Sequence, residues 1–184
     1  MTLSIITPTT LERVSLYQTI DAVSAMRAEG DEHIVVIDGD TIPHWLPTPA
    51  GVTYWTCKSR KSIYGNAQRD LGMAKATGQL LVFLDDDDLP GKDAYDVLHA
   101  LPSDNLTCHM FAMKYNGGAT KDAKASIPFS QVGGPQLVVP NRPDLPKWMS
   151  QNLYEADFHF MRGCVNMLSV IEHPEIICYV GGHE

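Results

Sequence analysis

The sequence predicts an α/β domain whose mostly parallel central sheet is flanked by helices. Up to about residue 100, short β-branched runs alternate with stretches of helical period, which is the order of strand, crossover helix and strand in parallel sheets. The run 34–37 is β-branched throughout, as expected for a strand buried on both faces of such a sheet. With 184 residues, the chain fits one domain of ordinary size, which we place at 1–184.

Turn residues and capping patterns divide the first half of the chain into elements. Pro8 stops the first strand, and Thr9 and Glu12 have the spacing of a capping box, which predicts a helix after them. Asn66 is suited to cap a second helix, and Gly78 closes it. We expect strands over 3–7, 33–38, 52–56 and 80–84 and helices over 11–27 and 67–76.

After residue 102 the regular alternation of strand and helix patterns ends. A turn over 116–118 follows an apolar run, and a proline-rich irregular stretch surrounds a short strand pattern. No internal repeat or low-complexity linker separates this half from the first, so we assign both to the same domain. We expect strands over 106–115, 137–139 and 176–180 and a helix over 153–168.

The composition excludes several kinds of protein. A net charge of −8 disfavours a protein that holds nucleic acid mainly by its phosphates, although the basic cluster 58–61 keeps a phosphate-bearing ligand open. No apolar stretch approaches the roughly 20 residues of a membrane span, and the first residues lack the basic region of a signal peptide. Four cysteines without a Cys-x-x-Cys pair predict reduced thiols. We therefore expect a soluble, cytoplasmic protein with no transmembrane segment.

Acidic residues follow two of the expected strands. Asp38 ends the strand 33–38, and four consecutive aspartates, 85–88, follow the strand 80–84. Open parallel sheets bind ligands outside the carboxyl ends of their strands. Adjacent carboxylates repel one another unless a cation screens them, and Mg²⁺ and Mn²⁺ prefer such oxygen ligands while keeping positions open for phosphates. The run therefore predicts a diphosphate-metal site, with a solvated turn that caps the next helix as the alternative.

Residues 64–88 carry a more specific pattern, YGNAQRDLGMAKATGQLLVFLDDDD. This segment resembles the signature of family 2 glycosyltransferases, in which a glycine, an Ala-Arg-Asn-like triplet and an Ala-x-Gly helix end precede an apolar strand and an Asp-x-Asp motif. The opening 6–9 and the strand that ends at Asp38 are similar to the nucleotide-binding elements of that family. The resemblance covers roughly residues 3–90. It implies a GT-A fold, which is Rossmann-like.

The resemblance also implies a donor site for a nucleotide sugar, most commonly a UDP-sugar. Thr7, Pro8 and Thr9 would line the nucleoside pocket, and Asp38 would bond to the base or ribose. Arg69 matches the arginine of the family triplet and would help to hold the donor. The first 100 residues would then form the nucleotide-sugar-binding half, and residues 101–184 the acceptor-side half.

The family's divalent ion, Mn²⁺ or Mg²⁺, would bind at the acidic run. By the resemblance, Asp85 and Asp87 are the two acids of the Asp-x-Asp motif, with Asp85 nearer the donor sugar or ribose and Asp87 on the metal. Asp86 and Asp85 would contribute to donor binding, and Asp85 also to the metal site. His183 is similar to the histidine near the end of the family's catalytic core, which in some members approaches the metal or diphosphate.

The segment around residue 155 is similar to the acidic pair that supplies the family's catalytic base. Transfer with inversion needs a base that takes the proton of the acceptor hydroxyl. Glu155 is the first candidate and Asp157 the second, and each has a plain alternative as a helix N-terminal charge. Aromatic rings are suited to stack on a sugar or base, or to pack in the core. The candidates for stacking are Trp45, Tyr64 and Trp148.

Other functions fit the sequence less well. A nucleotidyltransferase would have a glycine-rich loop after its first strand, where this chain has a proline and two threonines, and a haloacid-dehalogenase-like phosphatase would carry its aspartate on the first strand. The main alternative is a non-catalytic GT-A domain that binds a nucleotide sugar or a partner. The acceptor stays open among a glycan, a lipid, a protein and a hydroxymethylated nucleobase.

Overall fold

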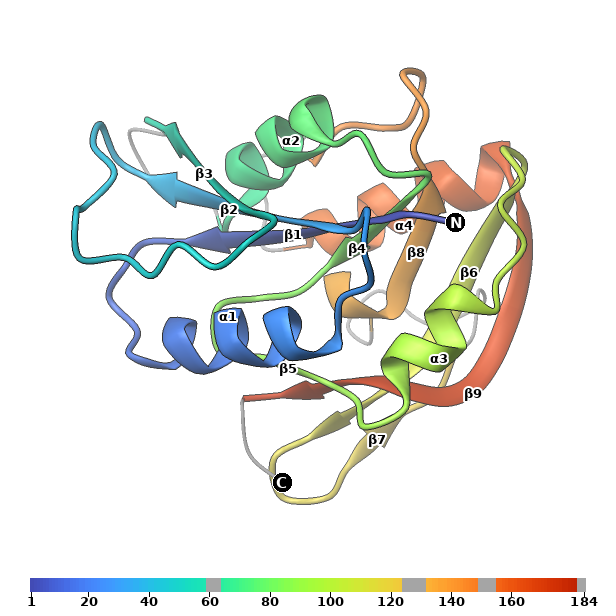
Figure 1. The fold of residues 1–184 in the computed structure, drawn as a ribbon. Helices are drawn as coiled ribbons and strands as arrows, with labels where there is room; N and C mark the ends of the chain where they lie inside the picture. The colour runs from blue at the N-terminus through green and yellow to red at the C-terminus, as the bar shows by residue number, and fades with distance from the viewer. Residues whose placement is uncertain (59–63, 124–131, 149–154, 182–184) are drawn as a thin grey trace.

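The computed structural model describes residues 1–58, 64–123, 132–148 and 155–181. Strands of these residues form one central sheet with helices on its faces (Figure 1). The strands are β1 (Leu3–Thr9), β2 (Glu32–Asp38), β3 (Val52–Cys57), β4 (Leu80–Phe83), β5 (Leu89–Pro90), β6 (Thr107–Tyr115), β7 (Thr120–Lys121), β8 (Leu137–Pro140) and β9 (Ser169–Val180). The helices are α1 (Ser15–Met26), α2 (Asn66–Lys75), α3 (Ala94–His99) and α4 (Ala156–Met167), and a 3-10 turn, η1, spans Gly134–Gln136.

The first half of the sheet is parallel. β1 lies between β2 and β4, and β3 pairs with the outer side of β2, so four parallel strands run in the order β3-β2-β1-β4. Parallel strands need crossover connections, which α1 and α2 supply. The α/β class and the sheet flanked by helices are confirmed. The carboxyl ends of β1, β2 and β4 therefore meet at one edge, which is where the acidic residues lie.

The second half of the sheet is mixed in direction. β8 runs antiparallel to both β4 and β6, and β9 pairs parallel with β6 and antiparallel with β5. β9 begins at Ser169, so the expected strand over 176–180 was too short. The pairing of β9 steps from His173 to Ile176 while β6 advances by one residue, so Pro174 and Glu175 form a bulge. A proline among polar residues hid the first part of this strand.

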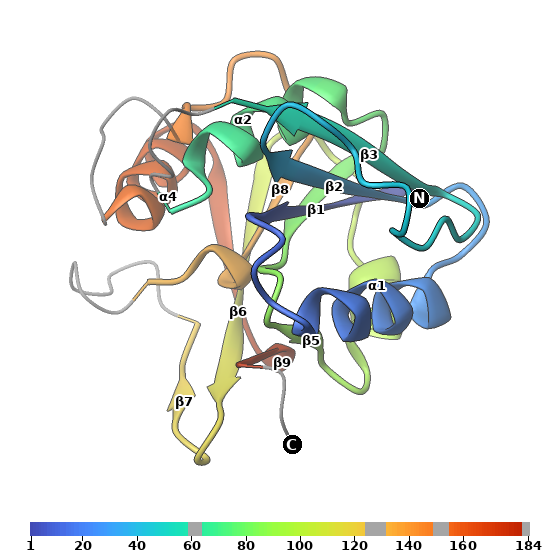
Figure 2. The same cartoon turned by 90° about the vertical axis from the view of Figure 1, so that its left-hand side faces the viewer.

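Helices cover both faces of the sheet. α2 and α4 pack on one face, where Met73 of α2 and Phe160 of α4 join a core cluster with residues of β1, β2, β4, β6 and β8. α1 and α3 lie on the other face, where Val23 and Leu98 pack with the alternate residues of β1 and β4. Figures 1 and 2 show these two layers from perpendicular directions. The alternation of side chains along each strand supplies both cores.

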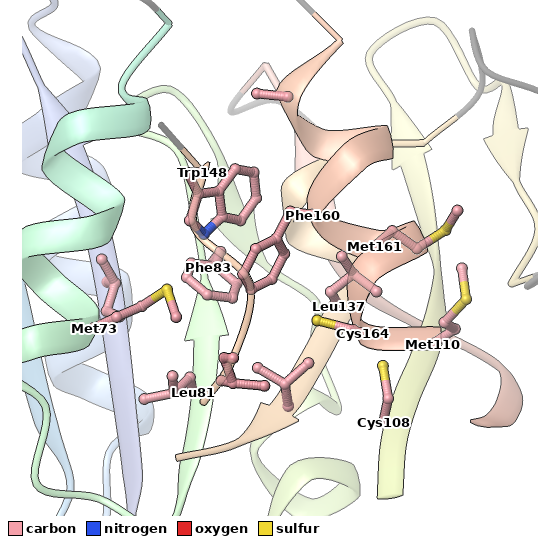
Figure 3. Packing of buried hydrophobic residues seen from close by; sticks show 14 of the residues in the cluster. Met73, Leu81, Phe83, Cys108, Met110, Leu137, Trp148, Phe160, Met161 and Cys164 are labelled. Atoms are coloured by element: carbon pink, nitrogen blue, oxygen red, sulfur yellow. The ribbon is translucent and has the colours of Figure 1, made fainter. Parts of the chain in front are cut away.

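Three aromatic rings fill the core between α2 and α4 (Figure 3). The Trp148 ring stacks on Phe160 with centroids 4.3 Å apart and meets the edge of Phe83 at 5.0 Å. Trp148 is 1% exposed. Of the two expectations for this residue, stacking on a ligand and packing in the core, the structure shows core packing.

The first helix starts later than expected. α1 begins at Ser15 rather than residue 11, and its first turn has no side-chain cap. Leu11 has a φ of 65°, outside the helical region, and its N–H donates to the Thr9 hydroxyl at 3.0 Å. The predicted capping box of Thr9 and Glu12 is wrong, because the Thr9 hydroxyl donates its own proton to Asp86 instead. The result is an irregular segment between β1 and α1.

Two further expectations concern the membrane and the thiols. No helix in the described ranges is long and apolar enough to cross a membrane. All four cysteines are free, and three of them are buried.

Gly65 fixes the start of α2 against β1. Its φ is 76°, and a Cβ at this position would lie 2.7 Å from Cβ of Pro8. Tyr64 before it also has a positive φ, 51°. A side chain at Gly65 would therefore meet both backbone strain and a close contact.

We expect Gly65→Ala to lower the free energy of unfolding by about 2 to 4 kcal/mol. Gly118→Ala is the matched control, because Gly118 also has a positive φ, 91°, but open space around it. The control should cost only about 1 to 2 kcal/mol of backbone strain. Urea unfolding of both variants measures the difference, and equal losses would show that the contact with Pro8 is unimportant.

Candidate functional site

Two cavities lie beside the carboxyl ends of β1 and β4. The small cavity has a volume of about 320 Å³ and the large cavity about 550 Å³. Four residues line both: Arg13, Tyr64, Arg69 and Asp85. The small cavity is completed by Pro8, Thr9, Thr10, Glu12, Gly65, Gln68 and Asp86. The large cavity is completed by Asn66, Asp87, Asp88, Met113, Tyr115, Lys121, Val132, Gly133, Gly134, Pro135, Glu155, Asp157, Phe158 and Val180.

The four aspartates after β4 alternate in exposure. The side chains of Asp85 and Asp87 are 35% and 36% exposed, whereas that of Asp86 is 8% exposed. Asp88 is also buried. Asp86 and Asp87 form a turn, closed by a hydrogen bond from the Asp88 N–H to the Asp85 carbonyl at 3.1 Å. Asp85 and Asp87 are therefore the acids more open to solvent, and Asp86 and Asp88 are available to hold the loop in place.

The buried acids bind to elements on either side of the loop. Asp86 accepts hydrogen bonds from the Thr9 hydroxyl at 2.7 Å and from Nη1 of Arg13 at 2.8 Å. Asp88 accepts the Gly181 N–H at 3.0 Å, just after β9. Burial and the nearby charge of Asp85 raise the pKa of Asp88 to about 7. The loop is thus fixed to β1 on one side and to the end of β9 on the other.

Arg69 is a rigid cation between the acids. It projects from α2, is 4% exposed, and donates through Nη1 to the Tyr64 carbonyl at 2.6 Å. Its Nη2 donates to Asp85, and its guanidinium lies 4.8 Å from the centre of the Trp148 ring. Burial alone would lower the pKa of Arg69, but Asp85 and Asp157 raise it above its ordinary value. The guanidinium is therefore charged and held in one position.

Arg13 is a second cation at the site, and sequence reasoning missed it. Its Nη1 contacts Asp86 at 2.8 Å and Asp87 at 2.9 Å, and its side chain is 54% exposed. It lies in the irregular segment before α1. No motif marks this residue, because its partners are more than 70 positions away in the sequence and only the β1–β4 pairing brings them together.

Glu155 and Asp157 lie at the start of α4 and line the large cavity. Glu155 is the N-cap residue, but its side chain makes no capping bond. Burial raises the pKa of Asp157, while Arg69 and a backbone hydrogen bond from Gly134 act against that increase. Both candidate bases thus share a cavity with Asp85 and Asp87. Of the two, Asp157 is the one whose carboxylate form the charge of Arg69 stabilises.

Only some of the other predicted residues line a cavity. Pro8 and Thr9 line the small cavity, whereas Thr7 and Asp38 line neither. Thr7 is fully buried, and its hydroxyl lies 2.9 Å from Nε2 of the buried His33. Asp38 is the last residue of β2, at the same edge of the sheet. His183 lies outside the described residues.

Of the candidate stacking residues, only Tyr64 is at the site. It is 61% exposed and lines both cavities. Trp45 is 49% exposed, packs against Tyr17 with ring centroids 6.1 Å apart, and lines neither cavity. In the basic cluster, Lys58 pairs with Asp40 at 2.6 Å, and the remaining residues lie outside the described ranges.

The acidic loop fits a divalent ion that is shared with a phosphate-bearing ligand. Asp85 and Asp87 present oxygen atoms beside the cavities, and among the described residues there is no cluster of three or more side chains that could hold a metal ion alone. Mg²⁺ and similar ions are typically bound by one or two carboxylates, with phosphates and water completing the shell. Four aspartates against two arginines also leave a negative balance in the loop.

The sequence matches Glycosyl transferase family 2 over residues 4–130, more than half of the chain. The protein belongs to this family. The match begins in β1 and extends past the acidic loop and β7. None of the curated protein sequences matches the chain.

Solved structures share the GT-A fold that the sequence predicted. The chain superposes on S. aureus TarS with a TM-score of 0.72 at 16% identity, covering 98% of this chain and 36% of TarS. For TarS 1-349 in complex with UDP-GlcNAc, the TM-score is 0.71 at 16% identity, covering 100% and 59%. For the mannosyltransferase PcManGT from Pyrobaculum calidifontis with GDP-Man and Mn²⁺, it is 0.65 at 15% identity, covering 97% and 56%. The family 2 chain thus spans about one third to three fifths of these structures.

His33 makes the sheet beneath the site sensitive to acid. Complete burial lowers the pKa of His33 to about 3, from an ordinary value of 6.5. The folded protein therefore favours the neutral ring, whereas the unfolded chain takes up a proton below pH 6.5. Stability from this group is present above pH 6.5 and is lost as the pH falls toward 3.

We expect the free energy of unfolding of the wild-type protein to fall by about 1.4 kcal/mol per pH unit below pH 6, relative to His33→Gln. Glutamine can keep a hydrogen bond to Thr7 but does not titrate. Denaturant unfolding of both proteins between pH 7 and 4 measures the difference, since other titrating groups cancel. Parallel pH profiles would contradict this role of His33.

Proposed function

We propose that this protein transfers a sugar from a UDP-sugar to an acceptor hydroxyl with the help of Mn²⁺ or Mg²⁺, and with inversion at the anomeric carbon. The observation that carries the proposal is the geometry of the acidic loop. Asp85 and Asp87 face the large cavity at the carboxyl ends of parallel strands, beside Arg13 and Arg69. Such an edge is where open α/β sheets bind nucleotides.

The small cavity is the proposed nucleoside pocket. Pro8 and Thr9 form one wall, and the exposed ring of Tyr64 offers a face for stacking on a base. Asp38 remains our proposed contact for the base or ribose, because it ends the strand next to β1. We propose that Thr7 supports the pocket from beside it, because its hydroxyl is hydrogen-bonded to His33.

The acidic loop would hold the proposed ion. Asp87 would bind the ion, with Asp85 beside it and nearer the donor sugar. A divalent ion supplies charge stabilisation for the leaving diphosphate. The complexes of the similar structures, TarS with UDP-GlcNAc and PcManGT with GDP-Man and Mn²⁺, support this choice of donor and ion.

The large cavity provides the proposed acceptor side, formed mainly by residues 101–184. Glu155 is our candidate for the base that takes the proton of the acceptor hydroxyl as that oxygen attacks the anomeric carbon. Asp157 is the second candidate, but its position under the field of Arg69 suits a charge partner better than a base. Tyr115 and Lys121 line the same cavity and provide a wall for the acceptor.

The proposal is tested by incubating the protein with UDP-glucose, UDP-galactose and UDP-N-acetylhexosamines in the presence of Mn²⁺. A thermal-shift screen ranks the donors, and release of UDP with water as acceptor reports turnover. Mn²⁺-dependent binding with UDP release supports the transferase. Donor binding without release of UDP would favour a domain that only binds the nucleotide sugar. The absence of both donor binding and UDP release would refute the transferase and the binding domain alike.

We expect Asp87→Ala to weaken Mn²⁺-dependent UDP binding at least about 100-fold, because the ion loses its proposed carboxylate ligand. The protein should stay folded, since the change also removes repulsion from Asp85 and Asp86. Asp21→Ala removes the same charge from the exposed surface of α1 and serves as the control. Calorimetric titration of UDP with and without Mn²⁺ gives the affinities, and an unchanged affinity in Asp87→Ala would place the ion elsewhere.

We expect Glu155→Gln to bind the donor as the wild-type protein does but to lower kcat for transfer by about 100- to 10,000-fold. The amide keeps the shape of the side chain but cannot accept a proton from the acceptor. Glu29→Gln, an exposed position that lines neither cavity, is the control. Full activity of Glu155→Gln would indicate either that Asp157 is the base or that transfer proceeds without inversion.

A further inference from the structure

Arg13 holds the acid that the proposed function assigns to the metal. A single nitrogen, Nη1, contacts Oδ1 of Asp86 at 2.8 Å and Oδ1 of Asp87 at 2.9 Å. We propose that Arg13 is an exchangeable counter-charge, which neutralises Asp87 in the absence of donor and moves to the donor diphosphate when a divalent ion binds Asp87. This inference rests on the proposed function and adds a donor-binding residue to it.

The two acids differ in what remains when Arg13 leaves. Asp86 keeps the hydrogen bond from the Thr9 hydroxyl at 2.7 Å to its other oxygen, so its buried position is preserved. Asp87 is 36% exposed and lines the large cavity. Departure of Arg13 therefore frees Asp87 as a ligand without releasing the loop from β1.

Arg69 and Arg13 are suited to different tasks. Arg69 is restrained on three sides, by the Tyr64 carbonyl, Asp85 and the Trp148 ring. The side chain of Arg13 is 54% exposed, and its ion pairs with described residues are made through Nη1. Arg13 also lines both cavities, so a rotation of its side chain can reach a ligand that spans them. Arg69 is fixed, whereas Arg13 has the freedom to change partners.

The electrostatics favour this exchange only when both ligands are present. A half-exposed ion pair contributes little to stability, so breaking the contact of Arg13 with Asp87 costs little. A divalent ion at Asp87 would repel the guanidinium, and a diphosphate offers it a bidentate, charge-assisted partner. Removing Arg13 should therefore have opposite effects on the ion alone and on the nucleotide.

We expect Arg13→Ala to bind Mn²⁺ alone about 3- to 10-fold more tightly than the wild-type protein, because a competitor for Asp87 is gone. In saturating Mn²⁺ the same variant should bind UDP about 10-fold more weakly, because a charge-assisted contact to the diphosphate is lost. Electron paramagnetic resonance of free Mn²⁺ measures the first affinity, and calorimetry with UDP the second. Neither measurement depends on turnover.

Two further variants control the experiment. Arg162→Ala removes a positive charge from an exposed position of α4 that lines neither cavity, and both affinities should stay at wild-type values. Arg13→Lys keeps a cation in the segment before α1, so its Mn²⁺ affinity should stay near that of the wild-type protein, while its UDP affinity falls because lysine cannot bind bidentately. Arg13→Lys thus distinguishes the effect of lost charge on the two affinities from an effect of altered structure in this segment.

The outcomes distinguish this inference from the proposed function. Wild-type protein that binds neither Mn²⁺ nor UDP overturns the proposed function, and the role of Arg13 with it. Normal wild-type binding, with Mn²⁺ affinity in Arg13→Ala unchanged or lower, overturns the exchange alone. An unchanged UDP affinity in Arg13→Ala overturns the contact with the diphosphate.

Discussion

The structure of the site depends on how the repulsion among four neighbouring carboxylates is compensated. Charges this close cannot remain ionised unless other groups compensate for them. The chain divides the run by alternation, so that Asp86 and Asp88 turn inward and Asp85 and Asp87 turn outward. The inward pair is held by hydrogen bonds from Thr9 and Gly181, and each outward acid has an arginine beside it.

These contacts also join the two halves of the sheet. Asp86 ties the loop to β1 in the parallel half, and Asp88 ties it to the end of β9 in the mixed half. Arg69 extends the connection, because it lies on the Trp148 ring that packs against Phe160 of α4. A shift of the acidic loop would therefore alter the packing of α4, and both candidate bases lie at the start of that helix.

The sequence was sufficient for the parts of the site that depend on local pattern. A buried apolar strand that ends in acids predicted that Asp85 would lie at the carboxyl end of that strand, and the family triplet singled out Arg69, which the structure places beside Asp85. Arg13 could not be predicted, because its role depends on a pairing between β1 and β4 and on a helix that starts later than its capping pattern indicated. The first part of β9 was missed for another reason, since Pro174 lies in an irregular stretch with two register shifts, beyond which the parallel pairing with β6 continues in both directions.

The charge of the large cavity argues for a cation as part of any anionic complex at this site. Among the described residues, five carboxylates line it, those of Asp85, Asp87, Asp88, Glu155 and Asp157, against three cations, Arg13, Arg69 and Lys121. The balance is two negative charges, lowered somewhat because Asp88 has a pKa of about 7. A diphosphate that entered alone would meet repulsion in a partly enclosed space where water screens poorly. A divalent ion would cancel that balance, and its proposed ligand, Asp87, is the outward acid whose partner, Arg13, is itself half-exposed.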